Sequence, residues 1–209
     1  MLSSLQADKS VSRQIESPMN ACRLRIRAVS ETDIERISDY FLKSDPDFLI
    51  HIGIDPKKVP FKIEFVSALM NEIKSRPEEK TSCHLIWELN DISIGHSNIN
   101  KIMFSSNACL HLHIWEPEQR NIGNGTLLVK DSISYFFKVF NLRSLYCEPY
   151  ALNPAPNKIL KKIGFEFMNF LEKTPDFMNY NQPVNQWMIT QEKWQYIFHN
   201  PLNPDKMEA

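Results

Sequence analysis

Residues 120–126 combine a cation, two glycines and a run of main-chain amides at a spacing that suits phosphate binding. The segment reads Arg-Asn-Ile-Gly-Asn-Gly-Thr. Residues 110–115 before it alternate apolar and polar types, which predicts a strand, and apolar residues after it recur with helical spacing. A strand that enters a helix through a glycine turn directs several N–H groups to one spot, and the helix N-terminus adds partial positive charge there. The turn therefore predicts a phosphate or pyrophosphate site.

Taken alone, this turn is a weak motif. It lacks the Gly-Lys-Ser/Thr ending of a P-loop and the three-glycine spacing of a dinucleotide fingerprint. A plain strand-to-helix connection without a ligand is an equally good interpretation, and a nucleotide-binding α/β protein is a further alternative.

Two histidines on the preceding predicted strand suit proton transfer. His111 and His113 are two residues apart, so both side chains leave the same face of the strand. Histidine accepts a proton near neutral pH, and either residue is a candidate general base. The more ordinary interpretation is a pair of hydrogen-bonded histidines on a sheet face. Glu88, on an earlier predicted strand, is a second candidate, and its more ordinary interpretation is a solvated strand residue.

Length and charge limit the classes of partner. The chain has 209 residues and a formal net charge of -1 at pH 7, so one domain without an electrostatic preference for nucleic acid or an anionic membrane is expected. No apolar run approaches the roughly 18 residues that a membrane span requires. The first residues lack the apolar segment of a secretory signal, which predicts a cytoplasmic protein.

The four cysteines are scattered and form no C-x-x-C pair. Reduced, buried thiols are therefore expected. A zinc site that uses Cys109 with His111 or His113 lacks the paired ligand spacings of structural zinc sites, and no metal is expected.

The expected order of elements is β-α-α-β-β-β-α-β-α-β-β. Antiparallel strands followed by a parallel β-α-β crossover predict an α/β fold, in which helices cover both faces of a mixed, mostly antiparallel sheet of six to seven strands. We expect a polar leader at residues 1–22, a domain at 23–194 and a tail at 195–209. A monomer and a homodimer both remain open, because an exposed strand near the C-terminus could pair with a second copy.

Three features in this order resemble the GNAT superfamily of N-acetyltransferases. Residues 120–126 are similar to the Arg/Gln-x-x-Gly-x-Gly/Ala turn with which that family binds the pyrophosphate of coenzyme A. Asn153, followed by Lys162-Ile163-Gly164-Phe165, resembles the family's Asn after the fifth strand and its helix ending in Lys-x-Gly-Phe. Residues 187–194 resemble the closing strand of the Rim-type ribosomal-protein alanine acetyltransferases. The resemblance covers about residues 23–194.

This resemblance implies transfer of an acetyl group from acetyl-CoA to a primary amine, which would be a small molecule or a protein N-terminus. The main chain of Ile114 and Trp115 would run beside the pantetheine arm. Asn153 would bond the pantetheine or the thioester end, or it would cap the helix that follows it. The implied pyrophosphate turn comprises Arg120, Asn121, Ile122, Gly123, Asn124, Gly125 and Thr126.

The chemistry requires a neutral amine. An amine of pKa ~10.4 is unprotonated in about 1 molecule in 1000 at pH 7, and a base recovers part of the roughly 4 kcal/mol involved. His113, nearer to the end of its strand and to the implied thioester, is the first choice for this base. Arylalkylamine acetyltransferases carry a similar His-x-His on the corresponding strand, whereas Rim-type enzymes more often place Glu and Tyr nearby.

The resemblance is weakest at the residue that would donate a proton to the leaving thiolate. Leu160 stands where many family members have a tyrosine. Tyr150 is the first substitute, with Tyr146 or water as alternatives. A further alternative is that no acid is needed, because the CoA thiolate leaves readily. A catalytically weak CoA-binding module is therefore an alternative function. The irregular segments 44–60 and 176–186 would select the acceptor.

Overall fold

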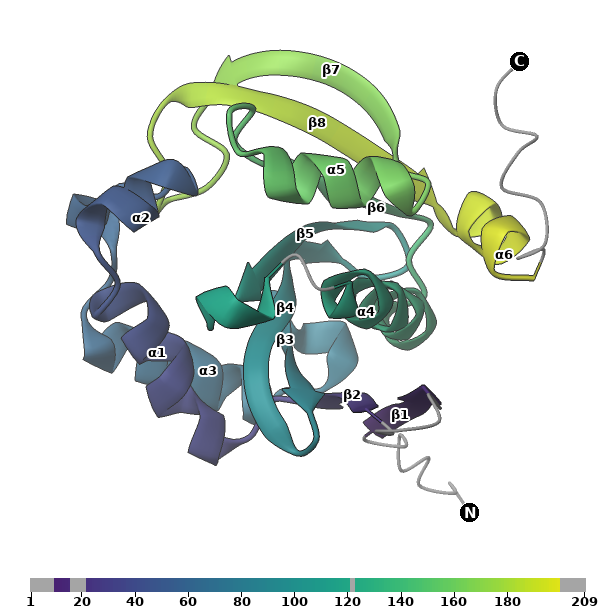
Figure 1. Ribbon diagram of the computed structural model, residues 1–209, viewed down its shortest axis with the longest axis horizontal. Helices are drawn as coiled ribbons and strands as arrows, with labels where there is room; N and C mark the ends of the chain where they lie inside the picture. Colours follow the sequence, from purple (N-terminus) through teal and green to yellow (C-terminus); the bar gives the residue numbers. More distant parts are fainter. Residues whose placement is uncertain (1–9, 16–21, 121–122, 200–209) are drawn as a thin grey trace.

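The computed structural model describes residues 10–15, 22–120 and 123–199, and in this part of the chain a single sheet of eight strands is surrounded by helices (Figure 1). The strands are β1 Ser10–Ile15, β2 Cys22–Ala28, β3 Ser82–Leu89, β4 Ile92–Met103, β5 Asn107–Ile114, β6 Ser144–Cys147, β7 Glu166–Lys173 and β8 Gln182–Thr190. The helices are α1 Ile34–Leu42, α2 Pro46–His51, α3 Lys62–Lys74, α4 Asn124–Phe140, α5 Pro154–Lys162 and α6 Gln191–His199.

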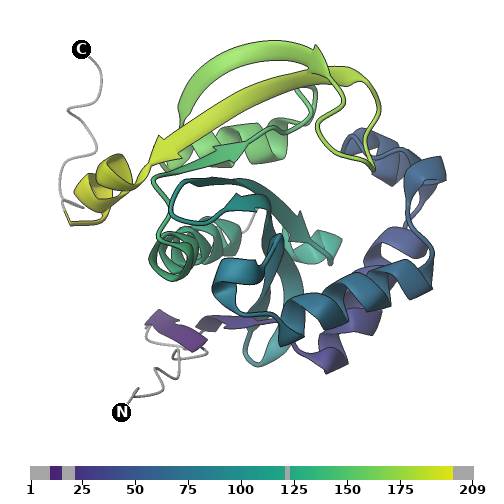
Figure 2. The same cartoon turned by 180° about the vertical axis from the view of Figure 1, so that it is seen from behind.

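The mixed α/β fold with a mostly antiparallel sheet is confirmed, and the sheet has one strand more than expected. Its order is β1-β2-β3-β4-β5-β6-β8-β7, and β5 and β6 form its parallel pair. The additional strand β1 comes from the segment expected to be a leader, and it pairs antiparallel with β2. Figures 1 and 2 show β7 and β8 as a curved pair at one end of the sheet and β1 at the other.

Two short helices also differ from the expectation. α2 lies in the segment expected to be irregular, and its start is fixed by Asp45, whose carboxylate accepts the N–H of Asp47 at 2.8 Å. Pro46 fits the first turn, because its missing N–H would have had no partner there. α6 follows β8 directly, so the expected domain boundary at residue 194 falls inside a helix.

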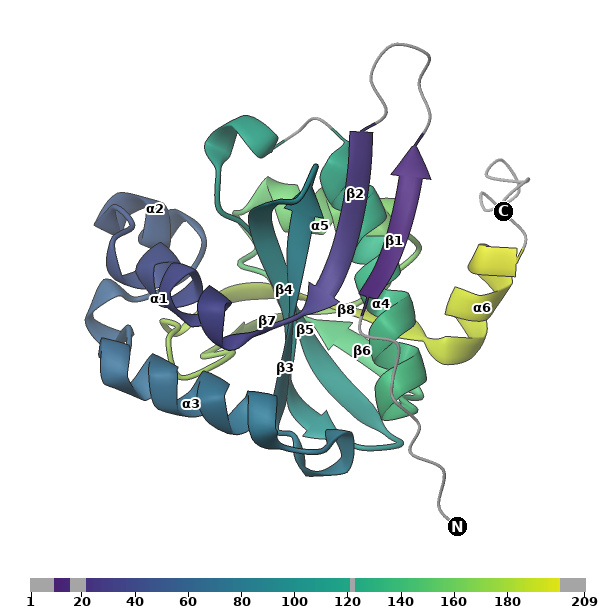
Figure 3. The same ribbon diagram turned by 90° about the horizontal axis from the view of Figure 1, so that it is seen from below.

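Each face of the sheet has its own hydrophobic core, because successive strand residues point to opposite faces. Leu85 and Trp87 of β3 pack with the apolar stripe of α4, whereas Ile86 between them packs with α1 and α3. Figure 3 shows α1, α2 and α3 on one side of β3–β5 and α4 on the other. The polar groups in the α4 core are paired, since Trp87 Nε1 donates to Ser132 Oγ at 2.9 Å.

The parallel pairing of β5 with β6 is short. Its register covers Asn107–Cys109 against Ser144–Tyr146, and one step later the thiol of Cys147 donates to the carbonyl of Leu110 at 3.1 Å. β5 continues along β4 as far as Ile114, whereas β6 stays paired with β8. The two strands therefore diverge after Cys109, and each is fixed on its outer side.

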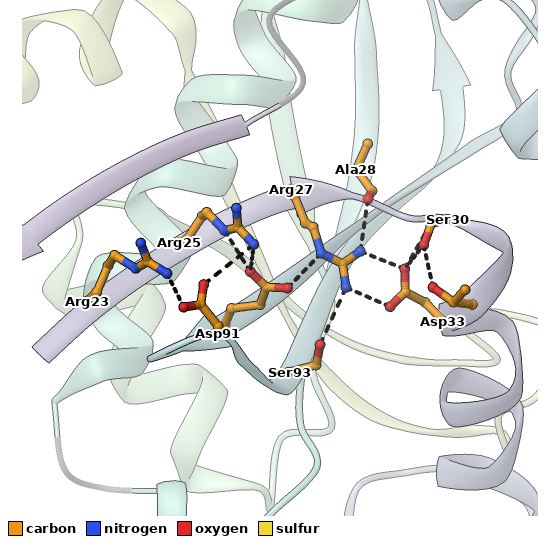
Figure 4. Close-up of polar contacts among 10 residues, drawn as sticks. Arg23, Arg25, Arg27, Ala28, Ser30, Asp33, Asp91 and Ser93 are labelled. Atoms are coloured by element: carbon orange, nitrogen blue, oxygen red, sulfur yellow. Dashed lines mark hydrogen bonds and ion pairs between the residues drawn. The ribbon is translucent and has the colours of Figure 1, made fainter.

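An ion-pair network ties β2 and β3 to the beginning of α1 (Figure 4). The guanidinium of Arg27 donates to both Asp33 oxygens at 2.6 and 2.7 Å and to Glu88 at 2.7 Å, and Arg25 donates to Glu88 at 2.7 Å. Asp33 and Glu88 are only 6% and 4% exposed. Burial alone would raise the pKa of Asp33, but the bonds from Arg27 and Ser30 lower it below its usual value.

We expect Arg27→Met to lower the free energy of unfolding by about 2–4 kcal/mol, because it leaves two buried carboxylates short of a cationic donor. Urea unfolding followed by circular dichroism measures this change. Arg23→Met is the matched control, since Arg23 pairs with the exposed Asp91 and its loss should change little. Equal losses in the two variants would contradict a structural role for the Arg27 network.

Candidate functional site

A cavity of about 730 Å³ lies on the α1 and α3 face of the sheet, beside the divergence of β5 and β6. Residues 111–114 of β5 form one wall, and residues 148–150, which follow β6, form another. The first turns of α4 and α5, the helices α1 to α3 and the segment before β8 also contribute to its lining. A concave space with a few polar groups among apolar walls is the usual form of a small-molecule site.

Four histidines from three neighbouring strands share the face that borders this cavity. His84 lies on β3, His96 on β4, and His111 and His113 on β5. His96 is the register partner of His113, and the two rings stack with centroids 4.6 Å apart. His84 and His96 were not among the candidate site residues expected from the sequence. Side chains alternate between the two faces along β3 and β4. Once the strands are paired, this alternation places both histidines on the face of His111 and His113.

His96 is a fixed hydrogen-bond donor. It is fully buried, and its Nδ1 accepts the indole N–H of Trp115 at 2.8 Å. The proton of the neutral ring is therefore assigned to Nε2, which has no partner among the described residues. Burial, with smaller contributions from the other histidines, holds the pKa of His96 well below its ordinary value.

His111 and His113, the two bases expected from the sequence, both border the cavity but are poor proton acceptors. Burial lowers the pKa of His113 to about 3, with smaller contributions from His111 and His84. Burial likewise lowers the pKa of His111 to about 4, although the charge of Asp176 opposes the shift. The Nε2 of His111 lies 3.1 Å from Oδ1 of Asn100, so that nitrogen is assigned as the donor.

His84 has a different environment from the other three, because a carboxylate holds its ring. Glu72 of α3 is 4% exposed and accepts Nδ1 of His84 at 2.7 Å, the His84 main-chain N–H at 2.6 Å and Ser82 Oγ at 2.9 Å. Burial alone would raise the pKa of Glu72, but His84 and Ser82 lower it below its usual value. Glu72 is therefore ionised at neutral pH.

Glu88, the second candidate base, does not border the cavity. It is neither a base nor a solvated strand residue, because Arg25 and Arg27 both bind its buried carboxylate. Sequence reasoning missed this role because both arginines are far from Glu88 in the chain.

The glycine turn leads into α4 at the rim of the cavity. Gly123 has a φ of +92°, a conformation that favours glycine, and Thr126 N–H donates to its carbonyl at 3.1 Å. Asn124 begins α4, and Gly125 borders the cavity, where an added Cβ would lie 3.3 Å from Cδ1 of Ile114. Of the expected pyrophosphate turn, Asn121 and Ile122 lie outside the described residues.

The end of β5 is bound by protein groups. Arg120 donates to the Ile114 carbonyl at 3.0 Å through Nη2, and its guanidinium lies 4.7 Å from the ring centroid of Phe48. Trp115 N–H donates to Ile94 O of β4 at 2.9 Å. Arg120 and Ile114 both border the cavity, whereas the amide of Trp115 is used within the sheet.

The structure shows a capping role for Asn153 and brings a further tyrosine to the site. Oδ1 of Asn153 accepts Ala155 N–H at 3.3 Å, and both Asn153 and Tyr150 border the cavity. Leu160, at the position of the family's tyrosine, is fully buried in the core. Tyr40 of α1, which sequence reasoning missed, packs edge-on against His113 at 5.5 Å, and burial raises the pKa of its phenol.

Among the described residues, no helix has both the length and the apolar composition to cross a membrane. Among the same residues, no cluster of three or more His, Cys, Asp or Glu side chains is arranged to hold a metal ion. Cys83, Cys109 and Cys147 are buried free thiols, as expected.

Comparisons with known proteins agree with this geometry. The family model described as an acetyltransferase (GNAT) domain matches residues 23–166. A solved spermidine N-acetyltransferase from Vibrio cholerae, in complex with CoA and spermine, has a TM-score of 0.68 at 19% identity, covering 82% of this chain and 98% of that one. RimL, a ribosomal L7/L12 α-N-protein acetyltransferase in complex with CoA, has a TM-score of 0.66 at 14% identity, with 87% and 99% covered. Both structures establish similarity of fold. No curated protein matches the sequence.

The lowered pKa values of the buried histidines predict that these rings stay uncharged in mildly acidic solution. In the folded protein, the rings of His96, His111 and His113 should remain neutral at about pH 5, whereas in urea they should titrate near pH 6.5. Nitrogen-15 NMR of the imidazole rings measures both states. A protonated ring for any of the three in the folded protein at about pH 6 would show that the cavity wall is more polar than its burial indicates.

Proposed function

Because this chain belongs to the GNAT acetyltransferase family, we propose that it binds acetyl-CoA between the diverging strands β5 and β6 and transfers the acetyl group to an amine held over the four histidines. Acetyl-CoA-dependent N-acetylation is the activity of the family. The assignment of individual residues to the cofactor and the acceptor is our proposal.

The divergence of β5 and β6 beside the cavity is the observation that carries the cofactor assignment. Past Cys109, the edge of β5 that faces β6 has no strand partner among the described residues, and main-chain polar groups require partners when they are buried. The pantetheine arm has amide groups that can serve as those partners. Its pyrophosphate would then lie at the N-terminus of α4, against the main-chain amides of Gly123, Asn124 and Gly125, because Thr126 N–H already donates to the Gly123 carbonyl.

Arg120 would have to exchange one partner for another when the cofactor binds. Its guanidinium now donates to the neutral carbonyl of Ile114. A phosphate offers a charge-assisted, bidentate bond, which is stronger than a bond to a neutral carbonyl. We propose that Arg120 turns to the phosphate and that the Ile114 carbonyl then becomes available to the pantetheine.

The acceptor carries a single amino group in this proposal. The carboxylates that border the cavity already have donors: Lys173 and Gln186 bind Glu148, Asn100 binds Asp176, and the main-chain N–H of Phe61 binds Glu64. A polyamine would need several unpaired carboxylates to neutralise its charges. A small monoamine and a protein N-terminus each present a single amino group and both fit the proposal.

The amine attacks the carbonyl carbon of the thioester, a C–N bond forms, and the C–S bond breaks to release the CoA thiolate. Tyr40 and Tyr150 both border the cavity, and their phenols could stabilise the oxyanion or protonate the thiolate. Tyr150 remains our choice for the proton donor to the thiolate.

Gly125→Leu should weaken CoA binding by at least about tenfold, because the side chain would fill the space between α4 and Ile114. Isothermal titration calorimetry with CoA measures this effect. Lys138→Leu, an exposed change near the other end of α4, is the control and should leave CoA affinity unchanged. Stronger binding of ATP or NAD than of CoA to the unaltered protein would instead support a nucleotide-binding protein.

The activity itself is tested with radiolabelled acetyl-CoA and three acceptors: an alkyl monoamine, spermidine and a short peptide with a free N-terminus. We expect a larger kcat/KM for the monoamine or the peptide than for spermidine, because the cavity offers few unpaired carboxylates. Preference for spermidine would overturn the single-amine assignment. Tight CoA binding without transfer to any acceptor would support the CoA-binding module.

A further inference from the structure

We propose that the paired side chains of His84 and Glu72 form the acceptor-amine site of this enzyme, and that Nε2 of His84 takes the proton of the incoming ammonium group. The inference rests on the proposed acetyl transfer and adds to it the residue that deprotonates the acceptor. Neither side chain was a candidate in the sequence.

The geometry of the pair is that of an oriented base. Glu72 accepts Nδ1–H of His84 at 2.7 Å, which leaves the lone pair on Nε2. The same carboxylate accepts the His84 main-chain N–H and the Ser82 hydroxyl, so it is fixed at three points. His84 borders the cavity, and its Nε2 has no hydrogen bond to a described residue. A buried carboxylate behind an imidazole sets its tautomer and stabilises the imidazolium that forms.

The other three histidines lack this arrangement. The lone pair of His96 is occupied by the indole N–H of Trp115, so its neutral ring cannot accept a proton from the acceptor. The ring of His111 is hydrogen-bonded to a neutral amide, Asn100, and the ring of His113 has no hydrogen bond to a described residue. An imidazolium at any of these positions would be buried without a carboxylate directly bonded to it, which is unfavourable.

Several ionisable groups surround His84 and determine the electrostatic environment of its ring. Glu72 of α3 is the nearest, His96 of β4 has its ring centroid 5.7 Å away, and His111 and His113 lie on β5. The three histidines are neutral at pH 7, which leaves the Glu72 carboxylate as the charge in direct contact with His84. A single ammonium group is therefore attracted to this side of the cavity, in agreement with a single-amine acceptor.

The proposed step is balanced without a further reactant. The ammonium gives one proton to Nε2 of His84, directly or through water, and the imidazolium remains bonded to Glu72. The amine lone pair then forms the C–N bond, the C–S bond breaks, and the thiolate leaves with the electron pair. The thiolate takes a proton from a donor in the cavity, and His84 returns its own proton to solvent before the next turnover.

The test compares two acceptors that differ in the need for a base. In His84→Ala, kcat/KM for an alkylamine, which is protonated at pH 7, should fall about 100-fold, whereas an arylamine, which is already neutral, should lose less than about threefold. Added imidazole should restore alkylamine turnover. Raising the pH should also restore it, because more of the amine is then neutral. His113→Ala is the matched control, and we expect equal effects on both acceptors and no rescue by imidazole.

Glu72→Gln provides a second variant that keeps the histidine. We expect the same selective loss for the alkylamine, with circular dichroism confirming the fold. Equal losses for both acceptors in His84→Ala, or no imidazole rescue, would overturn the proposal while leaving acetyl transfer by the unaltered enzyme intact. Failure of the unaltered enzyme to acetylate any amine would instead overturn the proposed function on which the dyad rests.

Discussion

The site depends on one constraint, which is that β5 and β6 cannot stay paired beyond three residues. β4 holds β5 in place as far as Ile114, and β8 holds β6 on its other side. Pro149, two residues after β6, has no N–H with which to continue a ladder. Because both strands are fixed on their outer sides, the space between them cannot close, and an extended ligand can complete the unpaired edge of β5. The proposed pantetheine contacts follow from this divergence.

The same sheet that leaves this space also determines the chemistry beside it. The period of two along β3, β4 and β5 brings four imidazoles to one face, and burial keeps three of them from accepting protons. The fourth, His84, differs because α3 crosses that face and places Glu72 behind its ring. The functional difference between otherwise similar histidines is therefore set by a helix that is remote from the cofactor.

The sequence was sufficient for the fold class because periodicity and turn residues are local signals. It identified the turn before α4 and the face of His111 and His113, and it gave the order of most elements. It did not identify the Glu72–His84 pair or the bond from Trp115 to His96, because both depend on strand register and helix placement. It also missed β1, since a short strand in a polar segment is stabilised by its pairing with β2 more than by its own composition.

The electrostatic environment of the proposed base His84 depends on the uncharged histidines beside it. An acceptor that enters as an ammonium ion leaves water for a cavity whose histidines are uncharged, and this transfer is unfavourable unless a carboxylate is near. Among the carboxylates that contact the cavity or its histidines, Glu148 is neutralised by Lys173, whereas Glu72 acts through a titratable imidazole. A proton that moves from the amine to His84 keeps the positive charge beside Glu72 and leaves the nucleophile neutral. The burial that makes His113 a poor base thus favours transfer of the acceptor's proton to His84, because the Glu72 carboxylate stabilises the imidazolium that forms there.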